Sequence, residues 1–115
     1  MDVERARALL AAKRADLQTL LAETEAAGRE DRSSEDEKGT DVADPAQSLT
    51  QQGMDDAIAE SLRDRITVID RALKRLDDGT YGLSVRSGEP IPDERLEADP
   101  AAELTIEEAR ADERG

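Results

Sequence analysis

The chain of 115 residues contains no cysteine, histidine, tryptophan or phenylalanine, and Tyr81 is its only aromatic residue. Zinc sites depend mainly on cysteine thiolates and histidine imidazoles, so their absence speaks against such a site. The same absence excludes disulfides and nucleophilic catalysis by cysteine or by a Ser-His-Asp triad. Since no nucleophile–base pair stands out, we expect the protein not to be an enzyme.

Basic residues are also scarce, because 16 Lys and Arg stand against 29 Asp and Glu and the formal net charge is −13. A chain this acidic repels a phosphate backbone, so we expect no direct nucleic-acid binding. The longest apolar run, residues 8–12, is too short to span a bilayer, and the first residues show no signal-peptide pattern. These features predict a cytoplasmic protein that does not enter membranes.

The composition that is present favours long helices packed along a narrow seam, since 39% of residues are charged and the mean hydropathy is −0.74. Residues 2–27 lack glycine and proline and are predicted to form a helix. A second helix is predicted over 45–78, because Asp44-Pro45 is a helix-start pattern and Gly79 suits a helix end. The predicted seam residues are Val3, Ala6, Leu10, Leu17, Leu20 and Ala27, then Leu49, Ile58, Leu62, Ile66, Ile69, Leu73 and Leu76.

Two facing seams predict a long antiparallel coiled-coil hairpin over residues 1–79, and such a hairpin needs no partner chain, so we expect a monomer. Gly28 is the expected end of the first helix. The residues that follow are polar and charged and show no periodicity. We therefore predict a tip loop over about residues 28–44.

Residues 80–115 form a different, turn-rich module that holds three of the four prolines. Ser87-Gly88 predicts a tight turn between two short extended pieces, and residues 80–104 leave little scope for a helix. Thr105-x-x-Glu108 fits a capping box at the start of a last helix. The predicted small core of the module consists of Leu83, Ile91, Leu96, Leu104 and Ile106.

From Leu73 onward the sequence resembles the DksA/TraR family of transcription factors. The residues that carry the resemblance are Ala72, Leu73, Leu76, Gly79, Thr80, Tyr81, Gly82, Gly88, Ile91, Arg95, Leu96, Glu97, Ala98, Pro100 and Leu104. The family has a coiled-coil hairpin and a zinc-finger module in which four cysteines bind zinc. The resemblance implies a mostly α fold with that hairpin, a small zinc-finger-like module and a C-terminal helix.

The four cysteine positions of the family correspond here to Ser84, Ser87, Thr105 and Glu108, with the family's spacing kept. Hydroxyls bind zinc poorly compared with thiolates, and one carboxylate does not complete a tetrahedral site. We therefore predict no metal. The positions have an architectural role instead, as turn residues and as the capping box.

Family members also carry an acidic D-x-x-D-x-A motif at the hairpin tip, which Asp41, Asp44 and Ala46 match. The motif alone does not separate a tip function from a plain helix-cap role for Asp44. Its place in the loop and the module downstream favour the tip function. The resemblance implies that the protein binds RNA polymerase, inserts the tip into the secondary channel and modulates initiation.

Relatives that bind the nucleotide ppGpp commonly have arginine where this chain has Asp99, and the surroundings here are acidic. Repulsion of this anionic nucleotide predicts weak or absent ppGpp binding. The basic side chains of Arg71, Lys74 and Arg75 remain candidates for basic contacts, but the preferred interpretation is a solvated face with i,i+4 pairs such as Asp70–Lys74. The alternative function is a degenerate family member that acts as a coiled-coil adaptor or oligomerisation module and needs only the apolar seam.

Overall fold

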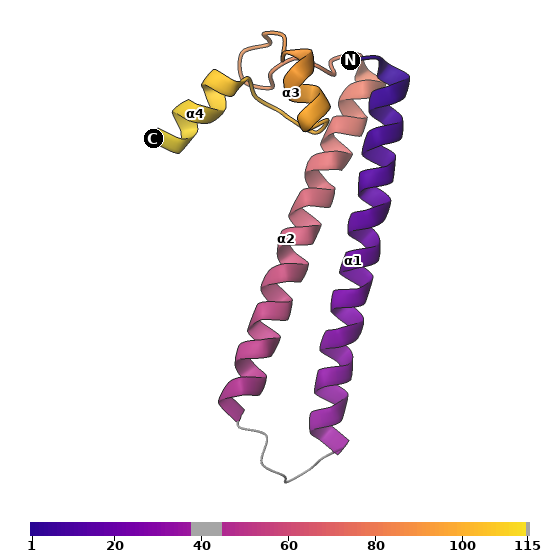
Figure 1. The fold of residues 1–115 in the computed structure, drawn as a ribbon, viewed down its shortest axis with the longest axis vertical. Helices are drawn as coiled ribbons and strands as arrows, with labels where there is room; N and C mark the ends of the chain where they lie inside the picture. Colours follow the sequence, from indigo (N-terminus) through magenta and orange to yellow (C-terminus); the bar gives the residue numbers. More distant parts are fainter. Residues whose placement is uncertain (38–44, 115) are drawn as a thin grey trace. The chain divides into compact units, whose positions relative to one another are not determined.

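The computed structural model describes the backbone of residues 1–37 and 45–114 and the side chains of residues 1–28 and 53–113. Four helices follow one another: α1 (Val3–Glu37), α2 (Pro45–Asp78), α3 (Asp93–Ala98) and α4 (Ile106–Arg114). In these residues no strand forms, and a single antiparallel bridge joins Leu83 to Pro90. The predicted mostly α fold, with its antiparallel hairpin and small module, is confirmed (Figure 1).

The chain divides into two compact units. The terminal unit comprises Met1–Arg14 and Thr67–Gly115, and the central unit comprises Ala15–Ile66. The start of α1, the end of α2 and the module of residues 80–115 therefore pack together within the terminal unit. No helix in the described part of the chain is long and apolar enough to cross a membrane.

In the terminal unit, the seam between α1 and α2 is built from small and branched aliphatic side chains. The buried residues there are Ala6, Leu10, Ile69, Ala72 and Leu76. Ion pairs flank this seam, with 2.6 Å between Arg14 Nε and Asp70 Oδ1 and 2.9 Å between Arg7 Nη2 and Asp77 Oδ1. Each helix carries an apolar stripe with charged residues on both sides of it. This pattern explains why two such polar helices pair.

The central unit continues the same pattern with its own buried residues and ion pair. Leu17, Ala59, Leu62 and Ile66 are its buried apolar side chains. Arg63 Nη2 lies 2.7 Å from Glu25 Oε1.

The predicted seam was wrong at Val3, Leu20 and Ile58, which are each about half exposed, and at Ala27, which is also exposed. The side chain of Leu49 lies outside the described residues. Ala59 and Ala72 are buried instead. An apolar stripe on a straight helix drifts around the axis relative to a fixed repeat. Alanines then reach the seam at positions where a search for large side chains overlooks them.

The first helix ends later than predicted, because α1 continues through Gly28 to Glu37. The predicted loop start at residue 28 was therefore wrong. Glycine inside a helix costs about 1 kcal/mol relative to alanine, which weakens a helix without ending it. The residues that follow contain no proline and several good helix formers, and Gly28 itself is buried.

The second helix has the predicted bounds, and its end has the predicted cause. Gly79 has φ +79°, and its N–H donates to the carbonyl of Leu76 while the N–H of Thr80 donates to the carbonyl of Arg75. These two bonds form a Schellman motif, which satisfies carbonyls that the helix leaves unpaired. The chain then turns sharply into the module.

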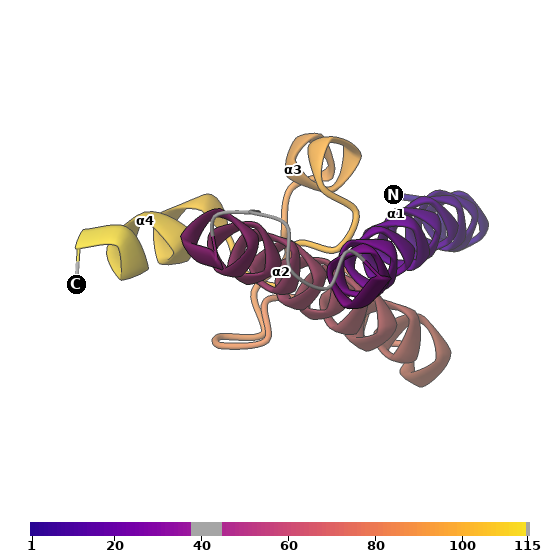
Figure 2. The same ribbon diagram turned by 90° about the horizontal axis from the view of Figure 1, so that it is seen from below.

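The short helix α3 contradicts the expectation of little helix between residues 80 and 104. The negative charges of Asp93 and Glu94 in its first turn interact favourably with the helix dipole. Six residues alone, however, do not form a stable helix. Tertiary contacts hold it: Leu96 is 2% exposed, and Arg5 of α1 lies 2.8 Å from Glu97. Figure 2 shows α3 beside the start of α1, with α4 projecting away from it.

The module core is smaller than predicted. Ile91, Leu96 and Ala102 form it, with Met1 and Tyr81 packed against them. Leu83 and Ile106 were predicted to be core residues but are more than one-third exposed. Ala101 and Ala102 are buried in their place because the segment after α3 turns inward.

Candidate functional site

The predicted tip residues fall largely outside the part of the chain that the structure describes. Asp41 and Asp44 lie outside the described residues altogether. Ala46 lies in the first turn of α2, where only the backbone is described. The tip assignment therefore stays a prediction from the sequence.

Ser84 and Ser87, the first pair of cysteine-equivalent positions, organise the turn that follows α2. Ser84 is buried, and its Oγ accepts hydrogen bonds from the N–H of Arg86 at 3.1 Å and of Ser87 at 3.2 Å. Ser87 Oγ accepts the N–H of Glu89 at 3.3 Å. The turn closes with a bond from the N–H of Gly88, at φ +77°, to the carbonyl of Ser84. The hydroxyls thus satisfy the backbone of their own turn.

Thr105 and Glu108, the second pair, form the predicted capping box. The N–H of Glu108 donates to Thr105 Oγ1 at 3.2 Å, and the N–H of Thr105 donates to Glu108 Oε1 at 3.0 Å. Both N–H groups would otherwise lack a partner at the start of α4. This reciprocal pair fixes where α4 begins.

All four cysteine-equivalent positions meet at the Glu108 carboxylate. Hydrogen bonds from the Ser84 hydroxyl, the Thr105 N–H and the Thr105 and Ser87 hydroxyls lower the pKa of Glu108 from 4.5 to about 2. We call these four residues the hydroxyl–carboxylate cluster. Ser84 and Ser87 belong to the first turn of the module, so their effect on Glu108 couples that turn to the start of α4. Among the described residues, no group of three or more His, Cys, Asp or Glu is arranged to hold a metal ion.

Two residues of the family-like sequence pattern fix the segment between α3 and α4. The hydroxyl of Tyr81 donates to the carbonyl of Pro100 at 2.8 Å, and Arg95 Nε donates to the carbonyl of Leu104 at 2.7 Å. Burial raises the pKa of Tyr81, so the phenol stays protonated and able to donate. These contacts explain why tyrosine and arginine occur at positions 81 and 95.

Asp99 acts locally on the same segment. Its Oδ1 accepts the N–H of Ala101 at 3.2 Å, and its carbonyl accepts the N–H of Ala102 at 3.0 Å. An aspartate that holds its own following turn is a common loop device. Asp99 therefore has a structural use, and its charge also contributes to the acidic surroundings that the sequence predicts.

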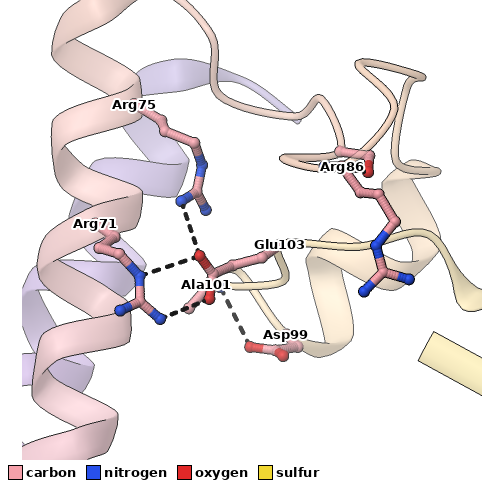
Figure 3. Close-up of polar contacts among 7 residues, drawn as sticks. Arg71, Arg75, Arg86, Asp99, Ala101 and Glu103 are labelled. Atoms are coloured by element: carbon pink, nitrogen blue, oxygen red, sulfur yellow. Dashed lines mark hydrogen bonds and ion pairs between the residues drawn. The ribbon is translucent and has the colours of Figure 1, made fainter. Parts of the chain in front are cut away.

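Two of the three basic side chains of α2 lie on the predicted solvated face, since Arg71 and Lys74 are exposed, whereas Arg75 is only 13% exposed. Arg71 and Arg75 both point toward the carboxylate of Glu103 (Figure 3). Lys74 pairs with Asp78 at 3.1 Å, whereas Asp70 pairs with an arginine of α1, so the predicted Asp70–Lys74 pair is wrong. The Glu103 carboxylate raises the pKa of Arg71 through its hydrogen bond and charge.

The sequence offered no signal for the role of Glu103. It lies 32 residues from Arg71 and 28 from Arg75, on the segment between α3 and α4. Only the chain reversal after α2 brings the three side chains together. Contacts of this separation are invisible to any local pattern.

Comparison with known proteins identifies close relatives. No protein-family model matches the chain. Over 80 residues it is 40% identical to the RNA polymerase-binding transcription factor DksA of Caulobacter vibrioides, covering 70% of this chain and 56% of that protein. Over 71 residues it is 41% identical to general stress protein 16O of Bacillus subtilis, covering 62% of this chain and 43% of that protein. The chain thus spans about half the length of these curated relatives.

The structural likeness extends further along the chain. The solved structure of transcription factor DksA2 from Pseudomonas aeruginosa matches 97% of this chain and 83% of that chain. The TM-score is 0.83 at 31% sequence identity. The likeness therefore includes both the hairpin and the module.

Proposed function

Because the chain belongs to the DksA/TraR family, we propose that it is a transcription regulator that binds RNA polymerase. The observation that carries this proposal is the match to DksA2 over 97% of the chain. The DksA of Caulobacter vibrioides is named as an RNA polymerase-binding factor, and this chain is 40% identical to it over 70% of its own length.

The proposed mode of action is insertion of the hairpin tip into the secondary channel, where Asp41, Asp44 and Ala46 act on initiation. The charge distribution supports this proposal. Residues 15–66 contain 14 acidic and five basic residues, a net charge of −9, whereas the rest of the chain carries only −4. An acidic hairpin is attracted to an electropositive partner surface and repels nucleic acid. The protein would modulate another enzyme and have no catalysis of its own.

We propose further that the module is metal-free. The hydroxyl–carboxylate cluster supports this, because its oxygen atoms already exchange hydrogen bonds with one another and with the backbone. Hydroxyl oxygens are also poor zinc ligands. Metal analysis of the purified protein tests the proposal, and stoichiometric zinc would refute it.

We also propose that ppGpp binds weakly or not at all. Asp99 contributes negative charge where relatives commonly have arginine, and the nearby arginines of α2 are already paired with Glu103. Titration of the polymerase complex with ppGpp tests this, and tight binding at the module would overturn it. We also keep two proposals from the sequence analysis, namely that the protein is cytoplasmic and that it is a monomer.

In vitro transcription with a double variant, Asp41→Asn with Asp44→Asn, tests the proposed function. We expect it to lose the effect on initiation while it still binds polymerase. A matched control is Asp16→Asn with Asp64→Asn, which removes the same charge from two exposed helix positions of the central unit. If the tip variant regulates like the wild type, the adaptor function is favoured and the tip mechanism is wrong.

A further inference from the structure

Glu103 joins three parts of the terminal unit. Its carboxylate accepts hydrogen bonds from Arg71 Nη2 at 2.9 Å and Nε at 3.1 Å and lies 3.5 Å from Arg75 Nη1. Its carbonyl accepts the N–H of Val85 at 2.9 Å. One residue on the segment between α3 and α4 thus contacts both the end of α2, as Figure 3 shows, and the first turn of the module.

The two arginines are not equivalent. The side chain of Arg71 is 53% exposed, so water solvates it if its partner is removed. The side chain of Arg75 is only 13% exposed, and its Nε and Nη2 have no hydrogen-bond partner in the structure. In the described part of the chain, Glu103 is the carboxylate that Arg75 contacts as an ion pair.

Removing Glu103 would therefore have an unequal effect. A largely buried cation that loses its counter-ion is unfavourable, while an exposed ion pair contributes little. Arg75 regains solvation when the segment that carries Glu103 moves away from α2. The core residues Ile91, Leu96 and Ala102 all belong to the module, and Met1 packs against them from the N-terminal end of the hairpin.

We propose that the Arg75–Glu103 pair is a latch that fixes the module on the end of α2. Opening this latch lets the module move as a folded body. The functional part of this inference rests on the proposed function and adds to it that the module also contacts polymerase. A protein that binds through both hairpin and module binds best when the joint between them is fixed in advance. Glu103 is then a positioning residue that contacts no substrate.

The lack of cysteine makes the joint directly measurable. Ala11→Cys on α1 and Ala111→Cys on α4 are exposed sites within the terminal unit, so two spin labels report one distance across the joint. We expect a single narrow distance distribution in this labelled chain. Glu103→Gln should broaden it, whereas Arg71→Gln should leave it narrow.

The decisive variant combines Glu103→Gln with Arg75→Met. It removes the buried cation together with its counter-ion, and such replacements of buried pairs are often neutral. We expect the narrow distribution to return. A distribution in Glu103→Gln as narrow as in the parent, or one that stays broad in the combined variant, overturns the latch.

Polymerase binding gives the functional readout. We expect Glu103→Gln to weaken binding about tenfold and the combined variant to bind within about threefold of the parent, following the cost of ordering a loose joint. Tyr81 fluorescence and helical circular dichroism control for loss of folding. If the parent chain does not bind polymerase, the proposed function fails while the spin-label result still decides the latch; if it binds and the variants bind equally, the functional part of the inference fails.

Discussion

Thr105 offers the most direct test of how the module holds together without cysteines. The residue is 6% exposed, and its hydroxyl accepts the N–H of Glu108 at the start of the nine-residue helix α4. Thr105→Val keeps the shape and removes this cap, which typically costs about 1 kcal/mol. Thr105→Ser keeps the cap and removes a buried methyl group, which costs about 0.8 kcal/mol. Thr105→Ala removes both, so we expect a loss of about 2 kcal/mol.

Urea unfolding measures these differences. Tyr81 is the only aromatic residue and lies in the module, so its fluorescence reports on the terminal unit while circular dichroism reports on all helices. With a urea m-value of roughly 2 kcal/mol/M, a loss of about 1 kcal/mol lowers the midpoint by about 0.5 M. A Thr105→Val variant as stable as the wild type, or an alanine variant no less stable than the serine variant, would refute the capping argument.

Three further predictions concern stability and binding. Because hydrogen bonds lower the pKa of Glu108 from 4.5 to about 2, its carboxylate stabilises the fold above pH 4.5 and this contribution is lost as the pH falls toward 2. Urea unfolding of wild type and Glu108→Gln at several pH values should show their difference shrinking over that range; a pH-independent difference would contradict this. Gly79→Ala should cost about 1 kcal/mol because φ is +79°, whereas Gly53→Ala, whose added methyl group would meet no atom within 4 Å, should gain about 1 kcal/mol. Thermal unfolding of both variants measures these changes in stability, and changes of the same sign in the two variants would contradict this prediction. The net charge of −9 over residues 15–66 should make the association rate with polymerase fall several-fold with added salt in stopped-flow binding, and a salt-independent rate would exclude electrostatic steering.

Local sequence signals predicted the helices whose ends carry capping residues. The bounds of α2 followed from Asp44-Pro45 and Gly79, since a helix start and a left-handed glycine each leave a short-range signature. The capping box of Thr105 and Glu108 is equally local, and the structure contains both of its hydrogen bonds.

Features that depend on contacts between residues distant in the sequence could not be predicted from local patterns. α3 exists because Leu96 is buried in the module core and Arg95 reaches the carbonyl of Leu104. The pairing of Arg75 with Glu103 joins segments 28 residues apart. The predicted end of α1 at Gly28 was wrong for the opposite reason. Gly28 is locally unfavourable in a helix, but the helical residues on both sides of it outweigh this cost.

The candidate site divides in the same way. The resemblance to the family's four cysteine positions singled out Ser84, Ser87, Thr105 and Glu108 as a set, and in the structure the other three act on the carboxylate of Glu108. No sequence pattern predicted that interactions among these side chains would couple the first turn of the module to the start of α4. The tip motif rests on the sequence and on the family, so its test lies in the polymerase complex.

The most direct test of the central claim is photo-crosslinking from position 41 of the hairpin after co-purification with core RNA polymerase. A photoreactive amino acid at Asp41 should crosslink to polymerase residues that line the secondary channel, and the same group at Ala111 on α4 should crosslink elsewhere. Failure to co-purify, or crosslinks from position 41 only to the outer surface of polymerase, would contradict the proposed function.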